Sequence, residues 1–267
     1  MKLSAGGVVS AEKILRAVRK NTMLISLVLV QSELGVIEPV AELGATLRAM
    51  RRSQKNTPLL HTDASQAALL LPLSVDRLGV DLMTLDAQKI YGPKGVGVLY
   101  RHRGVVLAPQ IFGGGQEFGL RSSTENVPLI VGMARALTLA SAGRKKEQAR
   151  LLKLRQRFLC LLKERVPEAV INGNPSRAVP STLHLSLPGK DAEMLVIALD
   201  ARGVSAATKT ACAESTERAS AVVLALGKDS AHAEGSLRFS FGRGTTVRDV
   251  EGAVAALAEA LQAMQNH

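Results

Sequence analysis

Lys89 lies four residues after Leu85, the last apolar residue of a run that is expected to form a buried strand. The pKa of a lysine amine changes readily when the amine is buried, and this property suits lysine to Schiff-base chemistry. A single lysine near a strand end is most often a solvated loop charge. The chemical interpretation of Lys89 therefore needs support from other polar residues.

Three further polar stretches supply that support. They are residues 31–35 (QSELG), residues 61–66 (HTDASQ) and the glycine-rich residues 112–126 (FGGGQEFGLRSSTEN). Functional groups collect at the carboxyl ends of strands in a parallel sheet, so a carboxylate, a lysine and several amides are expected to converge at one edge. Pyridoxal phosphate sites combine such a lysine with an acid opposite the pyridinium nitrogen. Each stretch alone could instead be a turn, because Asp and Ser are common turn formers.

Helical and strand patterns alternate through the first half of the chain. Ser10 is a candidate N-cap for the first helix, and residues 22–30 (TMLISLVLV) have the composition of a buried strand. This order predicts an α/β fold with a mostly parallel sheet covered by helices. The other segments expected here are a helix at 39–54 and strands at 58–65, 80–87 and 95–102.

A long helical pattern runs from about Val131 to Val166, and Gly143 is a candidate break in it. The pattern changes after this helix, which indicates a second, smaller α+β domain. We therefore predict a large domain over residues 1–140, and a long connecting helix with the small domain over residues 141–267.

The small domain is predicted from alternating strands and amphipathic helices. Residues 181–189 (STLHLSLPG) alternate like a strand with one open face, and Thr246 is a candidate cap for the closing helix. The other expected segments are a helix at 191–203, a strand at 235–246 and a helix at 246–264.

The composition suits one large domain, or one large and one small domain. The chain has 267 residues, of which 46% are hydrophobic and 3% aromatic. No apolar run is long enough to span a membrane, and the first 21 residues lack the features of a signal peptide. Cys160 and Cys212 form no metal-ligand pattern. We expect no metal site, no structural disulfide, no membrane association and a reducing, cytoplasmic location.

The net charge of +11 is compatible with nucleic-acid binding. The charges fall mostly on helical stretches such as residues 144–157, however, and no aromatic residues that could stack on bases lie between them. A solvated helix face is therefore the favoured interpretation, and we expect no direct contact with nucleic acid. An acidic protein partner or an anionic ligand stays open.

Long, ordered motifs connect the chain to a known family. Residues 61–66, 80–100 and 111–137, with residues 237–246 near the end, resemble the cysteine desulfurases and the closely related selenocysteine lyases. These are class V members of the fold-type I aminotransferases. The resemblance implies an incomplete, pyridoxal-phosphate-binding fold-type I large domain and a small C-terminal domain that carries a cysteine loop.

The resemblance implies roles for five residues. Lys89 matches the lysine that forms the internal aldimine with pyridoxal phosphate, and Asp63 matches the partner of the pyridinium nitrogen. Gln66 matches a donor to the phenolic oxygen of the ring. Thr124 matches a threonine that reaches the cofactor phosphate of the other subunit, which implies a homodimer. Arg238 matches the arginine that binds the substrate carboxylate, a task that suits a bidentate guanidinium.

Cys212 matches the cysteine that attacks the substrate sulfur and carries the persulfide. It follows a predicted strand at 203–207, and a helix is expected to begin at about Thr216. Lys209 and that helix start would favour the thiolate. Cys160 is instead expected to be a core residue, because Leu and Phe surround it in the sequence.

Three positions depart from the family pattern. Ser32 replaces an asparagine near the cofactor and substrate. Asp86 replaces a serine that donates to the phosphate, and it would repel the phosphate unless it turns away or pairs with a cation. Gln88 replaces a histidine, although its amide can still donate a hydrogen bond to the cofactor.

The resemblance also implies two features that this chain does not show. No residue before Lys13 resembles the family's glycine-threonine phosphate loop or its ring-stacking histidine. Weak cofactor binding is therefore expected.

Two classes of function follow. The first is a cysteine desulfurase that takes sulfur from L-cysteine and gives it to an acceptor protein, for iron–sulfur assembly or tRNA thiolation. The second is a shortened, non-catalytic relative that acts through its dimer or interaction surface. The sequence does not distinguish cysteine from selenocysteine as substrate.

Overall fold

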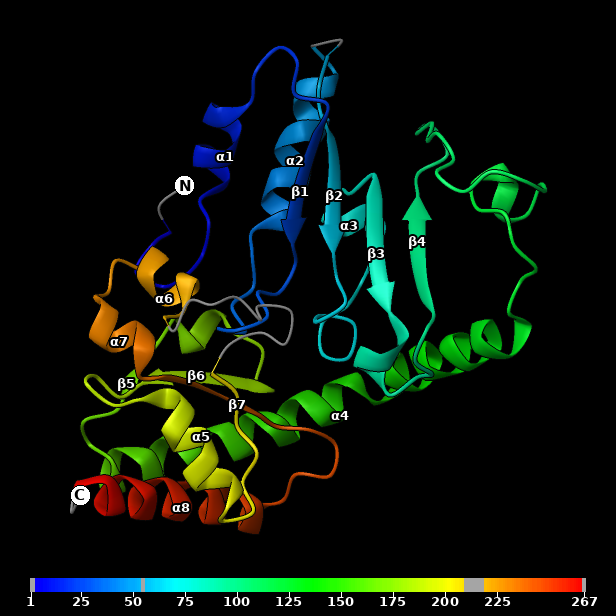
Figure 1. The fold of residues 1–267 in the computed structure, drawn as a ribbon. Helices are drawn as coiled ribbons and strands as arrows, with labels where there is room; N and C mark the ends of the chain where they lie inside the picture. Colours follow the sequence, from blue (N-terminus) through cyan, green and yellow to red (C-terminus); the bar gives the residue numbers. More distant parts are fainter. Residues whose placement is uncertain (1–2, 54–55, 209–218, 266–267) are drawn as a thin grey trace. The chain divides into compact units, whose positions relative to one another are not determined.

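The computed structural model describes residues 3–53, 56–208 and 219–265. The chain divides into two compact units (Figure 1). Unit 2 is formed by Ala17–Leu29 and Val40–Arg144. Unit 1 is formed by Met1–Arg16, Val30–Pro39 and Lys145–His267. The assignment of residues 1–140 to a cofactor-binding domain stays a prediction.

Unit 2 contains a four-stranded sheet with the strand order β1-β2-β3-β4. The first three strands are parallel neighbours, and β4 pairs with β3 in the antiparallel direction. The prediction of a mostly parallel sheet is confirmed. The strands are Leu24–Val28 (β1), Leu59–Asp63 (β2), Leu82–Asp86 (β3) and Gly97–Arg101 (β4).

Two helices, α2 (Val40–Arg51) and α3 (Val75–Leu78), lie behind the sheet in Figure 1. They approach each other closely at Gly44, where an added Cβ would lie 2.1 Å from the carbonyl oxygen of Leu78. Glycine is therefore required at this contact, because any side chain would push the two helices apart. These helices position the sheet whose edge carries the predicted site.

The prediction that residues 22–30 form a wholly buried strand is wrong. β1 buries Ile25, whereas Leu24 is 47% and Val28 39% exposed. Side chains alternate between the two faces of a strand, and α2 and α3 lie on one face only. An apolar run therefore indicated a strand correctly but did not show that one of its faces would stay open.

Unit 1 contains a three-stranded antiparallel sheet with the order β5-β6-β7. Its core includes Phe158, whose ring centroid lies 5.0 Å from that of Phe239 and 5.7 Å from that of Phe241. Antiparallel strands with helices form the α+β arrangement that the sequence predicts. The strands are Val170–Ile171 (β5), Thr182–Ser186 (β6) and Ser236–Ser240 (β7), and the packed helices are Ala192–Asp200 (α5) and Val247–Gln265 (α8).

β6 does not have the open face that its alternating pattern predicts. Leu183, His184, Leu185 and Ser186 are each 3% exposed or less. β6 is the central strand of its sheet, and the polar side chains of its second face are buried in hydrogen bonds. The alternation was real, but the polar face is inside unit 1.

The long helix α4 (Val127–Arg165) has 39 residues, and both units contain part of it. Gly143 does not break this helix, so the candidate break is wrong. One glycine in a helix interior costs only about 1 kcal/mol relative to alanine. Burial of side chains on both sides of it, such as Met133 and Leu151, outweighs that cost.

Cys160 is exposed on α4, so the prediction of a core cysteine is wrong. Phe158, Leu161 and Leu162 are buried, and Cys160 lies on another face of the helix. Sequence neighbours do not share a face in a helix, whereas residues three or four apart do. The leucines beside Cys160 in the sequence therefore do not enclose its thiol.

The remaining elements are short, and two predicted caps are confirmed. Ser10 Oγ accepts a hydrogen bond from Lys13 N at 3.3 Å, and Thr246 Oγ1 accepts one from Asp249 N at 3.2 Å. Within the part of the chain that the structure describes, no helix is long and apolar enough to cross a bilayer. The short helices are Ala11–Ala17 (α1), Ala221–Ala225 (α6) and Ser230–Glu234 (α7), with 3₁₀ helices at Ala87–Ile90 (η1), Glu117–Gly119 (η2) and Pro175–Arg177 (η3).

The strand predicted at residues 203–207 is also wrong. Within this segment, Ala207 forms an isolated bridge to Arg238, and the segment is not an extended strand. Thr216, the predicted helix start, lies outside the described residues. The next described helix, α6, begins at Ala221 after its N-cap Ser220.

Candidate active site

Lys89, Asp63 and Gln66 lie along one edge of the unit 2 sheet. Lys89 is an exposed residue of η1, which begins directly after β3. Asp63 ends β2, and Gln66 lies in the turn that follows, and both are exposed. A backbone hydrogen bond of 3.0 Å from Ala64 N to the carbonyl of Thr84 joins the two strand ends. The fold thus places these three residues as the sequence predicts, whereas their roles stay predictions.

The Asp63 carboxylate is held by its own turn. Its Oδ1 accepts a hydrogen bond from Ser65 N at 2.9 Å. This contact leaves the second carboxylate oxygen available to a cationic partner, and the residue is exposed. A fixed carboxylate and an exposed lysine on the same sheet edge are the groups that the pyridinium nitrogen and the aldehyde of pyridoxal phosphate require. The residues present therefore fit the ring end of that cofactor.

His61 is a site residue that the sequence interpretation missed. The His61 Nδ1 atom lies 2.8 Å from Ser26 Oγ on β1, and its Nε2 atom lies 3.3 Å from Thr84 Oγ1 on β3. The imidazole on β2 thus connects the side chains of the two neighbouring strands. Burial lowers the pKa of His61, and the charge of Asp63 opposes this shift. The spacing of two residues between His61 and Asp63 was the available signal, since it puts both on one face of the strand.

Asp86 and Gln88 interact with each other. Asp86 is the N-cap of η1, and its Oδ1 accepts a hydrogen bond from Gln88 N at 3.1 Å. Its Oδ2 accepts one from the Gln88 side-chain amide at 2.9 Å. The amide that was predicted to donate to the cofactor thus donates to Asp86 in this structure. Gln88 has two amide protons, so this contact does not remove its capacity to donate to a ligand.

Thr124 is exposed near the end of the glycine-rich loop. The loop is closed at its base by a bridge between Ile111 and Arg121. At its tip, Phe118 is 93% exposed and has a φ of 58°, in the left-handed region that non-glycine residues rarely adopt. An exposed aromatic ring on a strained backbone is typical of a surface that another molecule contacts.

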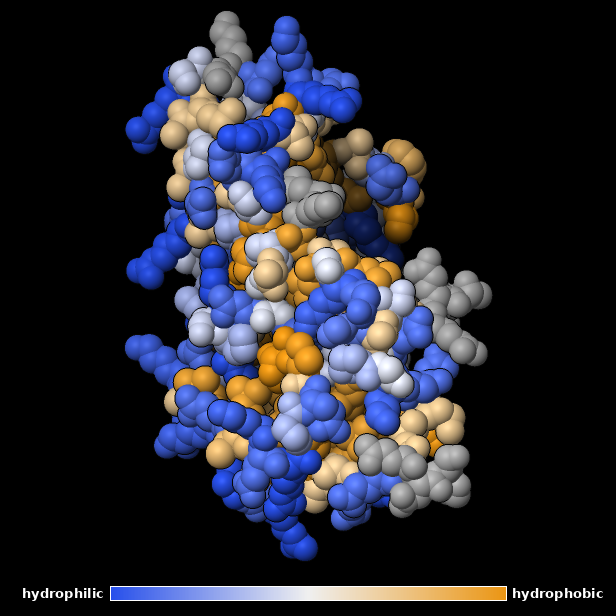
Figure 2. Space-filling model, turned by 90° about the vertical axis from the view of Figure 1, so that its left-hand side faces the viewer, coloured by the Kyte–Doolittle hydropathy of each residue, from blue (hydrophilic) through white to orange (hydrophobic). Residues whose placement is uncertain are grey.

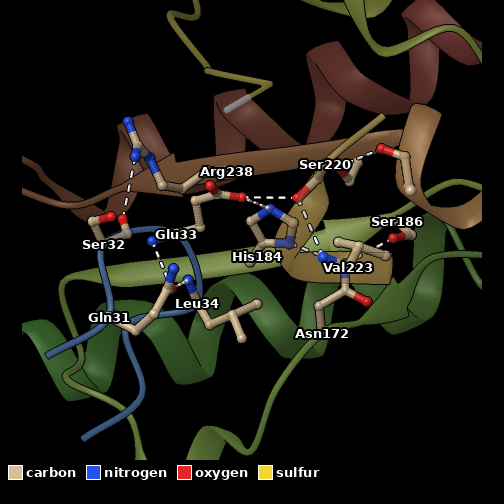
Figure 3. Close-up of polar contacts among 12 residues, drawn as sticks. Gln31, Ser32, Glu33, Leu34, Asn172, His184, Ser186, Ser220, Val223 and Arg238 are labelled. Carbon is tan, nitrogen blue, oxygen red and sulfur yellow. Dashed lines mark hydrogen bonds and ion pairs between the residues drawn. The ribbon is translucent and has the colours of Figure 1, made fainter. Parts of the chain in front are cut away.

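Ser32 and Arg238 come together in unit 1 (Figure 3). Arg238 lies on β7, and its Nη1 donates a hydrogen bond of 3.2 Å to the Ser32 carbonyl. Its Nε is buried and has no hydrogen-bond partner in the described part of the chain. The guanidinium therefore keeps unused donors, as a residue that binds a carboxylate must. The Ser32 side chain makes no part of this contact.

Cys212 and Lys209 lie outside the described residues. The first described residues after that segment are Ala219 and Ser220.

Unit 1 also contains a buried polar cluster that the sequence interpretation missed (Figure 3). Each member is 6% exposed or less, and the members come from four separate parts of the chain, two of them from β6. The one available signal was the polar face of residues 181–189, which we interpreted as solvated. The cluster consists of Glu33, Asn172, His184, Ser186 and Ser220.

Comparison with known proteins shows which family has this fold. The family model for aminotransferase class-V matches residues 1–252. The chain belongs to this family. Fold-type I enzymes of this class are its structural neighbours, so the predicted resemblance and fold class are confirmed.

The curated relatives of this class-V chain include cysteine desulfurases. It is 38% identical over 244 residues to a cysteine desulfurase IscS of Dictyoglomus turgidum, with 91% of this chain and 60% of the relative covered. It is 36% identical to a cysteine desulfurase IscS of Methanosarcina thermophila, with 97% and 63% covered. The chain thus spans about 60% of the length of these relatives.

Solved structures of related proteins have a similar fold. A NifS-like protein is 32% identical with a TM-score of 0.86, and the match covers 98% of this chain and 67% of that one. SspA, solved in complex with cysteine, is 28% identical with a TM-score of 0.70, and the match covers 90% and 65%.

Proposed function

We propose that this chain acts as a pyridoxal-phosphate-dependent cysteine desulfurase, which converts L-cysteine to L-alanine and carries the sulfur as a persulfide. The observation that carries the proposal is the shared sheet edge of Lys89, Asp63 and Gln66 in a class-V fold. The relatives named cysteine desulfurase support the choice of reaction. Bound pyridoxal phosphate would supply an electron sink that lets bonds at the substrate carbons break.

Four residues of this chain would have separate roles in this reaction. The Lys89 amine would bind the cofactor and move a proton at the substrate, and the Asp63 carboxylate would keep the ring nitrogen protonated. The unused donors of Arg238 would hold the substrate carboxylate. The Cys212 thiolate would attack the substrate sulfur, so that an S–S bond forms as the carbon–sulfur bond breaks.

The sulfur would then pass to an acceptor protein, and iron–sulfur assembly and tRNA thiolation are the two destinations that fit. A free thiol is needed for this task, so a reducing, cytoplasmic location is part of the proposal. A homodimer is also part of it. The exposed Phe118 and the neighbouring Thr124 on the glycine-rich loop support a second copy as the partner.

Borohydride trapping tests the cofactor site. The protein is incubated with pyridoxal phosphate, reduced, digested and mapped. We expect the reduced cofactor on Lys89 and not on Lys94, a second exposed lysine five residues away. An adduct on Lys94, or adducts spread evenly over many lysines, would contradict the assignment.

Persulfide trapping tests the reaction. After incubation with L-cysteine and an alkylating agent, the label is expected on Cys212 and is expected to be lost in Cys212→Ala. Because Cys160 is exposed, the experiment uses a Cys160→Ser background so that no label arises there. Sulfide release by Cys212→Ala at the parent's rate would show that Cys212 is not the nucleophile. Selenocysteine in place of cysteine tests the lyase alternative in the same assay.

A non-catalytic interaction protein is the second candidate. The observation that favours it is the apolar surface that unit 2 leaves exposed. Figure 2 shows hydrophobic side chains exposed between hydrophilic ones on the face that lies at the left in Figure 1, and the residues of unit 2 named below are taken from their exposed fractions instead. A chain that binds no cofactor at millimolar pyridoxal phosphate yet forms a stable dimer would decide for this candidate. The exposed residues of unit 2 include Leu24, Val28, Val98, Leu99, Phe112 and Val131.

A further inference from the structure

The Arg238 side chain is held by one main-chain carbonyl (Figure 3). Its Nη1 donates to the Ser32 carbonyl at 3.2 Å, and the described residues give the guanidinium no other hydrogen bond and no ion pair. The backbone of Arg238 is held separately, by its strand partner on β6 and by two hydrogen bonds with Ala207. The Ser32 carbonyl therefore determines where the end of the side chain lies.

No charged group substitutes for this carbonyl on the neighbouring strand. His184 lies opposite Arg238 on β6. Burial lowers the pKa of His184 to about 3, and the positive charges of Arg238 and Lys228 act in the same direction. The ring is therefore neutral at physiological pH. The position of the guanidinium thus depends on the conformation of residues 31–35, which contain the carbonyl.

The segment that contains this carbonyl is a single helical turn. Gln31 Oε1 accepts from the backbone nitrogens of Glu33 at 2.8 Å and Leu34 at 2.6 Å. The Gly35 nitrogen donates to the Gln31 carbonyl at 2.9 Å, and Gly35 has a φ of 71°. A Cβ on Gly35 would lie 2.9 Å from Thr182 Cβ, so the turn requires glycine where it packs against β6.

Gln31 stabilises the open end of this turn. The first backbone N–H groups of a helical turn have no partner inside the turn, and a side-chain oxygen that accepts from them holds the turn in place. Because Gly35 ends the turn in the left-handed conformation, the Ser32 carbonyl accepts from Arg238 instead of from a further helical residue. Both residues and the whole turn belong to unit 1.

We propose that Gln31 is a positioning residue, which holds the turn whose Ser32 carbonyl fixes the guanidinium of Arg238 for the substrate carboxylate. The inference rests on the proposed function, which assigns that carboxylate to Arg238. Gln31 itself acts only through the turn, so its loss should weaken the binding of ligands that have a carboxylate and spare those that lack one.

Asp191 offers a matched control in the same unit. Its Oδ1 accepts from Glu193 N at 2.9 Å and from Met194 N at 3.2 Å, which are the same spacings of two and three residues as at Gln31. Asp191→Ala therefore removes an equal pair of hydrogen bonds at the start of α5, away from the turn that contacts Arg238. The shorter Asp191 side chain also shows that an asparagine at position 31 can keep both contacts.

Two amines that differ only in a carboxylate test the inference. L-Alanine has the carboxylate and ethylamine lacks it, and each is titrated into protein loaded with pyridoxal phosphate and followed by absorbance. We expect Gln31→Ala to raise the Kd of L-alanine about tenfold and to leave the Kd of ethylamine within about twofold. Gln31→Asn and Asp191→Ala should each leave both constants within about twofold of the parent's.

Three results would overturn the positioning role. The first is a Gln31→Ala variant that binds L-alanine as tightly as the parent. The second is an equal loss of both amines in that variant, because general damage to the site would affect them alike. The third is an equal weakening of L-alanine binding by Asp191→Ala or by Gln31→Asn.

A measurement without cofactor separates this inference from the proposed function. Phenylglyoxal modifies arginine side chains, and its rate at Arg238 is divided by its rate at the exposed Arg103 in protein free of pyridoxal phosphate. We expect Gln31→Ala to raise this ratio about threefold or more, because the guanidinium loses its fixed acceptor, and Asp191→Ala to leave it unchanged. An unchanged ratio in Gln31→Ala overturns the inference. A raised ratio, with a parent protein that releases no sulfide, contradicts the proposed function and leaves the link from Gln31 to Arg238 intact.

Discussion

The two polar groups of this chain differ in how their side chains are satisfied. In unit 2, Asp63, Gln66 and Lys89 are exposed, and the Lys89 amine has no hydrogen bond or ion pair in the described part of the chain. In unit 1, Glu33 and Asn172 are buried and bonded to other side chains. The first group has capacity left for a ligand, whereas the second has used most of its capacity inside the protein.

Substitutions in these two groups of residues should therefore have different kinds of effect. A buried polar group without a partner costs roughly 1–3 kcal/mol, so the unit 1 cluster is stable only while its members stay together. An exposed lysine or carboxylate is solvated and costs little to keep. Substitutions in unit 2 should therefore change binding and activity, and substitutions in the unit 1 cluster should change stability or geometry.

Lys89→Ala should have the largest effect on activity. We expect sulfide release to fall by a factor on the order of 10³ or more, because the variant loses both the cofactor bond and the proton-transferring amine. Its midpoint of thermal unfolding should stay near the parent's, since the residue is exposed. Activity and calorimetry measured on the same preparations check this. Equal activity of Lys89→Ala and the control Lys94→Ala would contradict it.

Asn172→Ala should have the largest effect on stability. It leaves the Lys228 ammonium and the His184 ring without their common partner. We expect a loss of about 1–3 kcal/mol in the free energy of unfolding, measured by chemical denaturation. Gln66→Ala, at the exposed edge of unit 2, is expected to change this free energy by less than about 0.5 kcal/mol. Equal changes in the two variants would contradict the prediction that the unit 1 cluster contributes more to stability than the exposed edge of unit 2.

His184 should make the protein sensitive to acid. The pKa of His184 is about 3 in the folded chain and near the ordinary histidine value of 6.5 in the unfolded chain, so between these pH values only the unfolded chain binds the proton. Stability is therefore full above pH 6.5 and falls as the pH decreases, by about 1.4 kcal/mol per pH unit.

Denaturation midpoints at pH 7, 6 and 5 measure that slope. His184→Asn removes the titrating ring from between Glu33, Arg238 and Lys228 and should flatten the slope. The exposed His102→Asn should leave the slope unchanged. If His184→Asn and the parent lose stability in parallel, another group carries the acid sensitivity.

Asp86→Asn should have the smallest effect. Asparagine keeps the N-cap of η1 but removes the negative charge near the expected phosphate. We expect the dissociation constant for pyridoxal phosphate to decrease about three- to tenfold, with Asp86→Ser acting in the same direction. Cofactor titration monitored by absorbance checks both. An unchanged constant would show that Asp86, held by Gln88, does not face the phosphate.

The sequence predicted the elements that local patterns determine. Apolar runs located β2 and β3, polar residues located their ends, and Ser10 and Thr246 were recognised as caps. Ordered motifs around Lys89 identified the family because their spacing spans more than one element.

The sequence did not predict what covers each face. β1 and β6 show this most clearly, since the apolar run of β1 has an open face and the polar face of β6 is buried. Alternation determines which side chains share a face, but packing partners far along the chain determine burial. Ser220 contacts Glu33 across 187 positions, and no local pattern marks such a pair.

The path of the chain between its units limits how it can be divided. Residues 30–39 belong to unit 1, although unit 2 segments flank them on both sides. A protease cut or a genetic truncation near residue 140 would therefore separate Ser32 and Glu33 from Arg238 and Ser220. The C-terminal fragment would retain all three strands of its sheet but lose the carboxylate inside it. We expect such a fragment to be soluble only when the missing turn is supplied again, as a fused or added peptide.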